Sequence, residues 1–377
     1  MSGYIRSLDG VRALAILLVM LFHFYYVLEI GWIGVQIFFV LSGYLITKIL
    51  ISSKEKANLN GYLKRFYWRR TVRIFPLYYT YLFIVTLIFL ITGKPGNFGD
   101  TAAYLYTYTY NIQPLFSEFS HDAFFTHFWS LCVEEQFYLF WPLLIYSFNT
   151  KQTRVMIIVL SLFVPVFRLF FGEWLINQNY NEVGEILYRF TFSHFDAFAW
   201  GGAIAVFSLN KIIKPFHQKR ILIVSLILFI ISGVLNYIYL PDGIAGPSSI
   251  GYPIGGMNNY QSVWSYTLLN FFSASLIMYL VTMDNKKTYL GSLFKNKFAV
   301  QIGRISYGMY VYHWAALSFH KNYLNPIIGN MMISFVVYFV LVFTISWISF
   351  YTLEKFFLRL KETKFQFQKR YFLKGLK

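Results

Sequence analysis

The sequence predicts an all-α protein, a polytopic transmembrane helix bundle of about ten spans with both termini in the cytoplasm. Three observations support this prediction. The composition is 57% hydrophobic and only 13% charged, with a mean hydropathy of +0.51 over 377 residues. Long apolar stretches recur along the chain, and basic residues gather in every second connection between them. A chain of this composition must turn most of its surface towards lipid.

Ten apolar windows each approach the ~20 residues that a helix needs to cross ~30 Å of hydrocarbon. They lie at about residues 8–28, 33–51, 74–92, 128–148, 153–171, 187–208, 221–240, 262–283, 298–319 and 328–353. A further window, 101–113, is short and rich in tyrosine, so we expect an interfacial or re-entrant segment there. The first window follows Arg6 closely, but no small-residue cleavage site follows it, and we interpret it as a retained span.

The net charge of +17 reflects mainly how the chain is threaded through the membrane. Of the 33 Lys and Arg residues, 26 lie in one alternate set of segments, and only Lys94 and Lys321 lie in the other. The positive-inside rule therefore predicts cytoplasmic termini, a transmembrane domain over 1–354 and a basic cytoplasmic tail over 355–377. The charge needs no nucleic-acid partner. The single cysteine, Cys132, excludes an internal disulfide and a cysteine-built zinc site, and we expect no bound metal.

The first apolar window carries three ionisable residues on one side. Arg12 and His23 are eleven residues apart, almost three helical turns, so they share a face and are separated by ~16 Å along the axis. Asp9 lies one turn before Arg12 on roughly the same face. Arg12 could extend to the headgroups while His23 packs between helices. Burying an ionisable residue inside a membrane costs free energy, however. Such residues therefore usually mark a pathway for a substrate or ion, or a functional site. We expect this face to line a polar cavity.

A second group of polar residues lies in the window 128–148, where Glu134 and Glu135 are adjacent. Ser130, Glu134 and Tyr138 recur every four residues and share one helical face. Counted inwards from the outer side, Glu134 lies within one turn of the depth expected for His23. A buried carboxylate needs a partner. The candidates are His23 and, as purely structural partners, Arg168 and Arg189.

A third group of charged residues precedes the span at 74–92. Arg65, Arg69 and Arg73 are spaced by four residues and form one stripe, with Arg70 beside them. Pro76 is expected to end or kink this run. The stripe is explained equally well as positive-inside charge or as a cradle for anions, because arginine makes bidentate contacts with phosphates. Phosphates bound here and a histidine–glutamate pair near the outside would suit one long, phosphorylated substrate.

Six segments in this order resemble the membrane acyltransferase 3 family. They are SLDGVRALAILLVMLFHF, GVQIFFVLSGYLITKIL, RRTVRIFPLYY, FWSLCVEEQFYLFWPLL, SHFDAFAWGGAIA and GRISYGMYVYHW. That family holds bacterial enzymes of the cytoplasmic membrane that O-acetylate lipopolysaccharide O-antigen, peptidoglycan and exopolysaccharides. Some members append an extracytoplasmic SGNH domain, which we do not expect in this chain. The resemblance implies acetyl-CoA as donor, no permanently bound cofactor and a saccharide hydroxyl as acceptor.

The resemblance also implies roles for individual residues. The positions that match the family's motifs are Arg12 with His23, the arginines Arg69, Arg70 and Arg73, and the pair Glu134 and Glu135. We expect Arg12 and the Arg65–Arg73 group to bind CoA, His23 to act as base, and Glu134 or Glu135 to orient it. Candidates for contacts with the substrate or the oxyanion are Asp9, Ser42, Tyr44, Gln136, Tyr138, Asp196 and His313.

Several alternatives remain open from the sequence. The acyl group could pass directly to the acceptor or through an acylated histidine or serine. If His23 is structural, the base and carboxylate could be His313 and Asp196. A proton-coupled transporter or a flippase for lipid-linked glycans would also use polar residues inside the membrane. We find no internal repeat that would favour the transporter.

Overall fold

The computed structural model describes residues 4–93, 98–116, 124–180, 182–239, 246–253 and 261–360, and every regular element within these ranges is helical. The helices are α1 (Arg6–His23), α2 (Ile33–Lys54), α3 (Leu59–Thr92), α4 (Phe98–Tyr106), α5 (Trp129–Ser147), α6 (Thr150–Asn177), α7 (Val183–Arg189), α8 (Phe195–Val206), α9 (Leu209–Ile212), α10 (Pro215–Tyr239), α11 (Gln261–Thr282), α12 (Tyr289–Phe294), α13 (Lys297–Phe319), α14 (Asn325–Ile328) and α15 (Met331–Ser349). The shorter elements are η1 (Glu29–Trp32), η2 (Tyr110–Leu115), η3 (Thr126–Phe128), η4 (Thr191–His194), η5 (Pro247–Ser249) and the π-helical turns η7 (His320–Leu324) and η8 (Phe350–Glu354). The predicted all-α class is confirmed.

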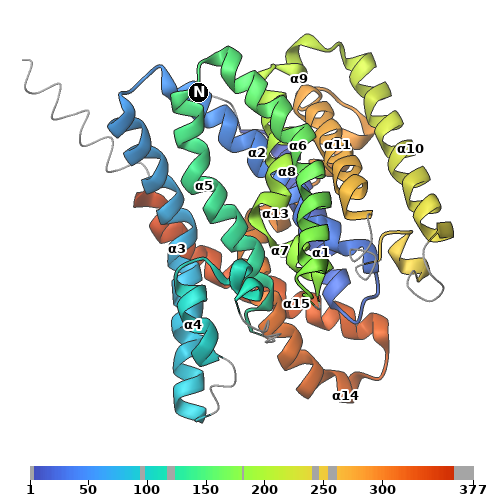
Figure 1. Ribbon diagram of the computed structural model, residues 1–377. Coiled ribbons are helices and arrows are strands. Elements are labelled where there is room, and N and C mark those ends of the chain that lie inside the picture. The colour runs from blue at the N-terminus through green and yellow to red at the C-terminus, as the bar shows by residue number, and fades with distance from the viewer. Residues whose placement is uncertain are drawn as a thin grey trace, which may run out of the picture. The chain divides into compact units, whose positions relative to one another are not determined.

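The chain divides into two compact units. The first unit comprises Met1–Ser52, Thr107–Phe119 and Thr126–Ser306, and the second comprises Ser53–Tyr106, Ser120–Phe125 and Tyr307–Lys377. In the first unit, α6, α8 and α11 lie side by side, with α10 packed along α11 (Figure 1). In the second unit, the short helix α4 lies along α3.

Six helical stretches in the described part of the chain are long and apolar enough to cross a membrane, which makes this a multi-pass membrane protein. They are Glu29–Lys54, Leu59–Thr92, Thr150–Asn177, Pro215–Tyr239, Val263–Thr282 and Met331–Leu360. Helices α1, α5 and α13 are more polar and contain predicted site residues. The predicted span 187–208 is divided among α7, η4 and α8, and the 12 residues of α8 reach only about 18 Å.

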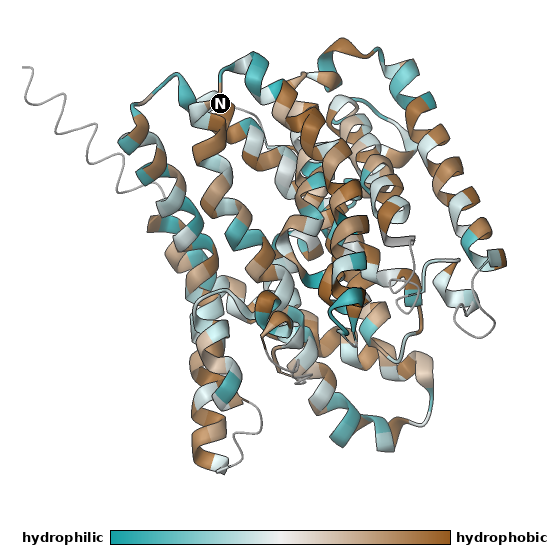
Figure 2. Ribbon diagram, viewed as in Figure 1, coloured by the Kyte–Doolittle hydropathy of each residue, from teal (hydrophilic) through white to brown (hydrophobic). Residues whose placement is uncertain are grey.

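Helix α3 is the longest element of the second unit. It runs for 34 residues, or about 51 Å, and continues through Pro76, so the expectation that proline would end the helix is wrong. Figure 2 shows hydrophilic residues in its N-terminal half and hydrophobic residues in its C-terminal half. The helix stops at Gly93, whose φ of 62° lies in the left-handed region that glycine adopts without strain. The window 101–113 is divided between α4 and η2, two elements too short to cross a bilayer.

Side-chain contacts fix the relative directions of neighbouring helices within the first unit. Helix α2 runs parallel to η4 and α8, because Gln36 meets His194 near one end and Thr47 lies beside Gly202 further along. Helices α10 and α11 are antiparallel; the contacts that show it are Ser225 with Ser275 and Asn236 with Ser265. Both relations agree with spans that alternate in direction along the chain.

Glycines allow helix backbones in the first unit to touch. A Cβ atom at Gly201 of α8 would lie 1.9 Å from the carbonyl oxygen of Val40, and one at Gly43 of α2 would lie 2.2 Å from that of Phe198. Real Cβ atoms do not approach oxygen this closely, so only glycine fits. Small residues at such crossings are typical of helices that pack within lipid. They hold α2 directly against α8.

We predict that Gly201→Ala destabilises the protein by about 1–3 kcal/mol, because the added methyl group forces α2 and α8 apart. The measurement is thermal unfolding of the detergent-solubilised protein. Gly99→Ala in α4 is the matched control, since a Cβ there meets nothing within 4 Å. Equal unfolding temperatures for the two variants would show that α2 and α8 do not cross this closely.

Candidate functional site

Ser42, Glu134 and Tyr138 form a polar cluster between α2 and α5. The Ser42 hydroxyl donates a hydrogen bond to the Glu134 carboxylate, and its oxygen lies 3.4 Å from the Tyr138 hydroxyl. Ser42 and Glu134 are half-buried and Tyr138 is buried. The sequence placed Glu134 and Tyr138 on one face of α5, and the structure adds Ser42 from α2. The cluster combines a hydroxyl nucleophile, a carboxylate and a phenol donor.

His23 is the last residue of α1. Its ring packs edge-on against Phe22, with 4.8 Å between ring centroids, and remains half-buried. The chain turns sharply just after it, because Tyr25 and Tyr26 have positive φ angles of 52° and 53°. The pairing of His23 with Glu134 remains a prediction.

Asp9 binds Arg12 within α1. The carboxylate of Asp9 is only 4% exposed and accepts hydrogen bonds from the Arg12 guanidinium and the Tyr4 hydroxyl. Arg304 donates to the Tyr4 oxygen from 3.3 Å. Partial burial raises the pKa of the Tyr4 phenol above its usual value, and the hydrogen bond to Asp9 raises it further, so Tyr4 remains a donor at neutral pH. Asp9 therefore orients Arg12, and as a carboxylate it cannot donate to an oxyanion.

Gln136 is occupied by structural hydrogen bonds. Its amide nitrogen donates to the Tyr108 carbonyl and to the Asn111 side chain, both at 2.8 Å, and its oxygen accepts from Thr191. Gln136 thus ties α5 to the segment around η2, and its amide hydrogens are already committed. This makes Gln136 a poor oxyanion donor. Glu135, the residue before it, is half-buried.

Tyr44 is buried and lies two positions after Ser42, on a different face of α2. Its hydroxyl accepts a hydrogen bond of 3.1 Å from Lys48, one turn further along the helix. Because Tyr44 accepts this bond, its own hydroxyl hydrogen is still available for donation, and the Lys48 amine lies beside it. Tyr44 remains a candidate donor to an oxyanion on chemical grounds.

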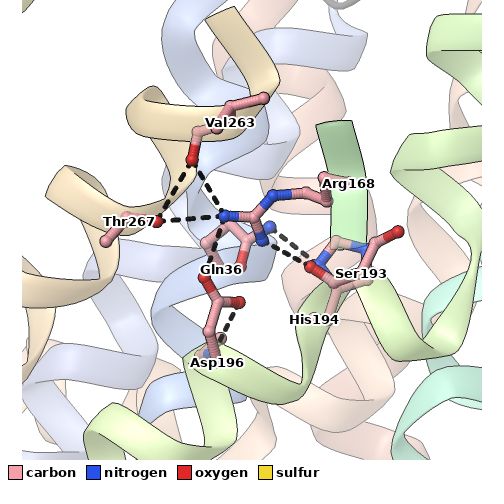
Figure 3. Close-up of polar contacts among 8 residues, drawn as sticks. Gln36, Arg168, Ser193, His194, Asp196, Val263 and Thr267 are labelled. Atoms are coloured by element: carbon pink, nitrogen blue, oxygen red, sulfur yellow. Dashed lines mark hydrogen bonds and ion pairs between the residues drawn. The ribbon is translucent and has the colours of Figure 1, made fainter. Parts of the chain in front are cut away.

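Arg168 lies at the centre of a buried hydrogen-bond network in the first unit (Figure 3). Its guanidinium pairs with the Asp196 carboxylate at 3.0 Å, and both side chains have no exposed surface. It also donates to the Ser193 carbonyl at 2.7 Å and to the Thr267 hydroxyl at 3.0 Å. The proposed structural partner of Glu134 is therefore committed to Asp196. Arg189, the other proposed partner, pairs with Glu185.

His194 is a fully buried histidine whose partners could not be inferred from the sequence. Its Nε2 lies 2.6 Å from the Tyr188 carbonyl, and its Nδ1 lies 2.8 Å from the Gln36 amide nitrogen (Figure 3 labels Gln36 and His194). A carbonyl only accepts, so Nε2 carries the proton and Nδ1 accepts from Gln36. The ring is thus a neutral connector between α2 and the start of α8.

The arginine stripe lies on α3 in the second unit. Arg65 is exposed, whereas Arg69, Arg70 and Arg73 are half-buried. The Arg70 guanidinium lies over the Phe66 ring, 5.8 Å from its centroid. The stripe keeps the one-sided spacing expected from the sequence and includes both accessible and partly desolvated cations.

Two buried groups of the second unit complete the description. Glu354, at the end of η8, is 6% exposed, faces the charge of Arg73 and has one carboxylate oxygen without a hydrogen-bond partner in the described part of the chain. Glu354 is not conspicuous in the sequence because it lies just beyond an apolar window. His313 is fully buried, and its Nδ1 donates to the Tyr310 carbonyl at 2.6 Å.

The profile of a family described as an acyltransferase domain matches residues 5–351. The chain belongs to the acyltransferase 3 family. The matched range contains every residue described above as part of the candidate site except Tyr4 and Glu354. Among the described residues of this acyltransferase-domain chain, no group of three or more His, Cys, Asp or Glu side chains could hold a metal ion.

Curated relatives of this acyltransferase 3 chain carry related names. The peptidoglycan O-acetyltransferase OatA of Listeria monocytogenes is 28% identical over 332 residues, which cover 84% of this chain and 50% of the relative. A putative O-acetyltransferase of Staphylococcus aureus strain COL is 27% identical over 340 residues, covering 85% and 52%. The O-acetyltransferase OatA of S. aureus strain NCTC 8325 is 27% identical over 330 residues, with the same coverage. The chain spans about half the length of these relatives, and no solved structure matches it significantly.

We predict that Asp196→Asn destabilises the acyltransferase-domain chain by about 3–5 kcal/mol, because it leaves Arg168 as an unpaired buried charge. Thermal unfolding in detergent measures the effect. Asp100→Asn, at an exposed position of α4, is the control and should change stability by less than about 0.5 kcal/mol. A normally stable but inactive Asp196→Asn variant would instead favour the alternative catalytic role considered for Asp196.

Proposed function

We propose that the chain is a membrane-embedded O-acyltransferase that moves an acetyl group from cytoplasmic acetyl-CoA to a hydroxyl of a cell-surface or lipid-linked polysaccharide. The observation that carries the proposal is the Ser42–Glu134–Tyr138 cluster, polar and accessible, in a chain of the acyltransferase 3 family. The name of the Listeria relative makes a peptidoglycan saccharide the first acceptor to test, ahead of O-antigen.

The proposal includes ten spans across the bacterial cytoplasmic membrane, with both termini in the cytoplasm. The asymmetric distribution of basic residues supports it. The relative helix directions within the first unit support it as well. With alternating spans, α2 and the 187–208 segment both run inwards, and their contacts are parallel. The contacts of α10 with α11 are antiparallel, as consecutive spans require.

Binding of the acyl donor, acetyl-CoA, is assigned to the arginines. Arg69, Arg70 and Arg73 provide charge-assisted hydrogen bonds for the phosphates of CoA, and Arg65 adds an exposed cation to the same stripe. Arg12 is assigned to the donor as well, held in position by Asp9. Acetyl-CoA is a substrate here and no resident cofactor is required.

The transfer chemistry is assigned to His23 and the cluster. His23, at the end of α1, removes the proton from the acceptor hydroxyl as the new ester bond forms. Glu134 orients the base. The hydroxyl of Tyr138, and on another face that of Tyr44, can donate to the oxyanion of the tetrahedral intermediate. The proton then passes to the leaving group of the acyl transfer.

We predict that Arg73→Ala weakens CoA binding by about ten-fold to over a hundred-fold, because one partly desolvated charge-assisted contact contributes about 1.5–3 kcal/mol. Equilibrium binding of CoA to the purified protein measures this. Lys64→Ala is the matched control: it removes the same charge from the same helix, at an exposed position on another face. If both variants bind CoA like the wild type, the stripe serves topology alone.

We predict that His23→Ala abolishes acetyl transfer while leaving CoA binding nearly intact, and that Glu134→Gln slows transfer strongly. The assay follows release of free thiol from acetyl-CoA in the presence of peptidoglycan fragments, together with the mass of the glycan product. A transporter or flippase would release no thiol. A folded His23→Ala variant with a near-normal rate would move the search for the base to His313.

A further inference from the structure

We propose that Ser42 carries the acyl group as a covalent ester between the donor and the acceptor. This inference rests on the proposed acyltransferase function and adds a nucleophile to it. A serine becomes nucleophilic when a neighbouring base accepts its proton, and the diagnostic geometry is a hydrogen bond from the hydroxyl to that base. The Ser42 hydroxyl donates such a bond to the Glu134 carboxylate.

The surroundings of Ser42 match the other needs of an acyl carrier. The Tyr138 hydroxyl, 3.4 Å from Ser42 Oγ, is an O–H group close to the nucleophile, where it can donate to the carbonyl oxygen of an acyl group attached to Ser42. Ser42 and Glu134 are half-buried, so a substrate can reach them while most water is excluded. The next residue, Gly43, presses against the Phe198 backbone, which holds this turn of α2 in a fixed position.

Other serines in the first unit are bonded differently. Ser161 donates to the Ile157 carbonyl of its own helix at 2.9 Å, and Ser130 donates to the His127 carbonyl at 3.2 Å. Ser7 also donates to a carboxylate, that of Asp284, but that group receives the Ser7 backbone N–H as well, as is typical of a helix end. Ser7 is fully buried. Ser42 combines a carboxylate partner with partial exposure.

The reaction then has two balanced halves. In the first, Ser42 Oγ attacks the thioester carbon, the C–S bond breaks, and the serine proton passes through Glu134 to the departing thiolate of CoA. In the second, the acceptor hydroxyl attacks the acyl-serine ester, and the bond between the acyl carbon and Ser42 Oγ breaks. The acceptor proton passes through His23 to the departing Ser42 Oγ, which restores both the serine hydroxyl and the neutral imidazole. Donor and acceptor therefore need not be bound together.

The test is to incubate the full-length, detergent-purified protein with acetyl-CoA, without acceptor, and to measure the mass of its peptides. We expect one acetyl group on the peptide that contains Ser42, and loss of that group when peptidoglycan fragments are added. Initial rates should follow ping-pong kinetics. Ser42→Ala should lose both the label and the transfer. Ser161→Ala, a half-buried serine bonded to a backbone carbonyl, should keep both.

The Ser42→Cys variant guards against a folding defect, because it should accumulate a more slowly discharged thioester at the same position. Folded Ser42→Ala protein that transfers at the normal rate would overturn the carrier and leave the acyltransferase function intact. Sequential kinetics with no acetylated Ser42 in active wild-type protein would overturn it equally. The absence of any acetyl transfer by the wild type would instead contradict the proposed function itself.

Discussion

The ion pair between Arg168 and Asp196 is the interaction on which the first unit depends. Two unexposed charges in an apolar chain are tolerated only when each is paired and hydrogen-bonded. Arg168 achieves this with groups from η4, α8 and α11, including Thr267, so its own helix α6 cannot move independently of them. Helix α8 in turn meets α2 where Gly201 approaches the Val40 carbonyl, two residues before Ser42. The position of the polar cluster therefore depends on a buried pair of charges that lies outside it.

Much of the fold was predictable because hydropathy and length determine which segments can enter lipid. The window 33–51 became Ile33–Lys54 and the window 221–240 became Pro215–Tyr239. The window 187–208 was predicted as one span but is broken, because Ser193 and Asp196 bind partners on α6 that no local pattern reveals. Pro76 was expected to end or kink a helix. A helix in lipid or packed against neighbours tolerates the loss of one backbone hydrogen bond.

The identities of the site residues were more predictable than their partners. Ionisable residues in apolar windows stand out in a sequence, which is why Glu134 was identified. Its bond to Ser42 joins residues 92 positions apart and required the packing of α2 on α5. Arg168 was predicted as a possible partner of Glu134. It binds Asp196 instead, because helix packing determines which carboxylate is nearest. Glu354 was not predicted, because a single acidic residue just after an apolar window resembles the charged residues that commonly flank a membrane span.

The unbroken course of α3 has a mechanical consequence. A continuous helix of about 51 Å is a stiff rod that is longer than the ~30 Å hydrocarbon layer, so part of it must project beyond one membrane surface. The projecting end carries the cations, and the missing hydrogen bond at Pro76 lies three residues beyond Arg73. Bending of the helix therefore costs least next to the arginine stripe, at Pro76, while the turns on either side remain fully hydrogen-bonded.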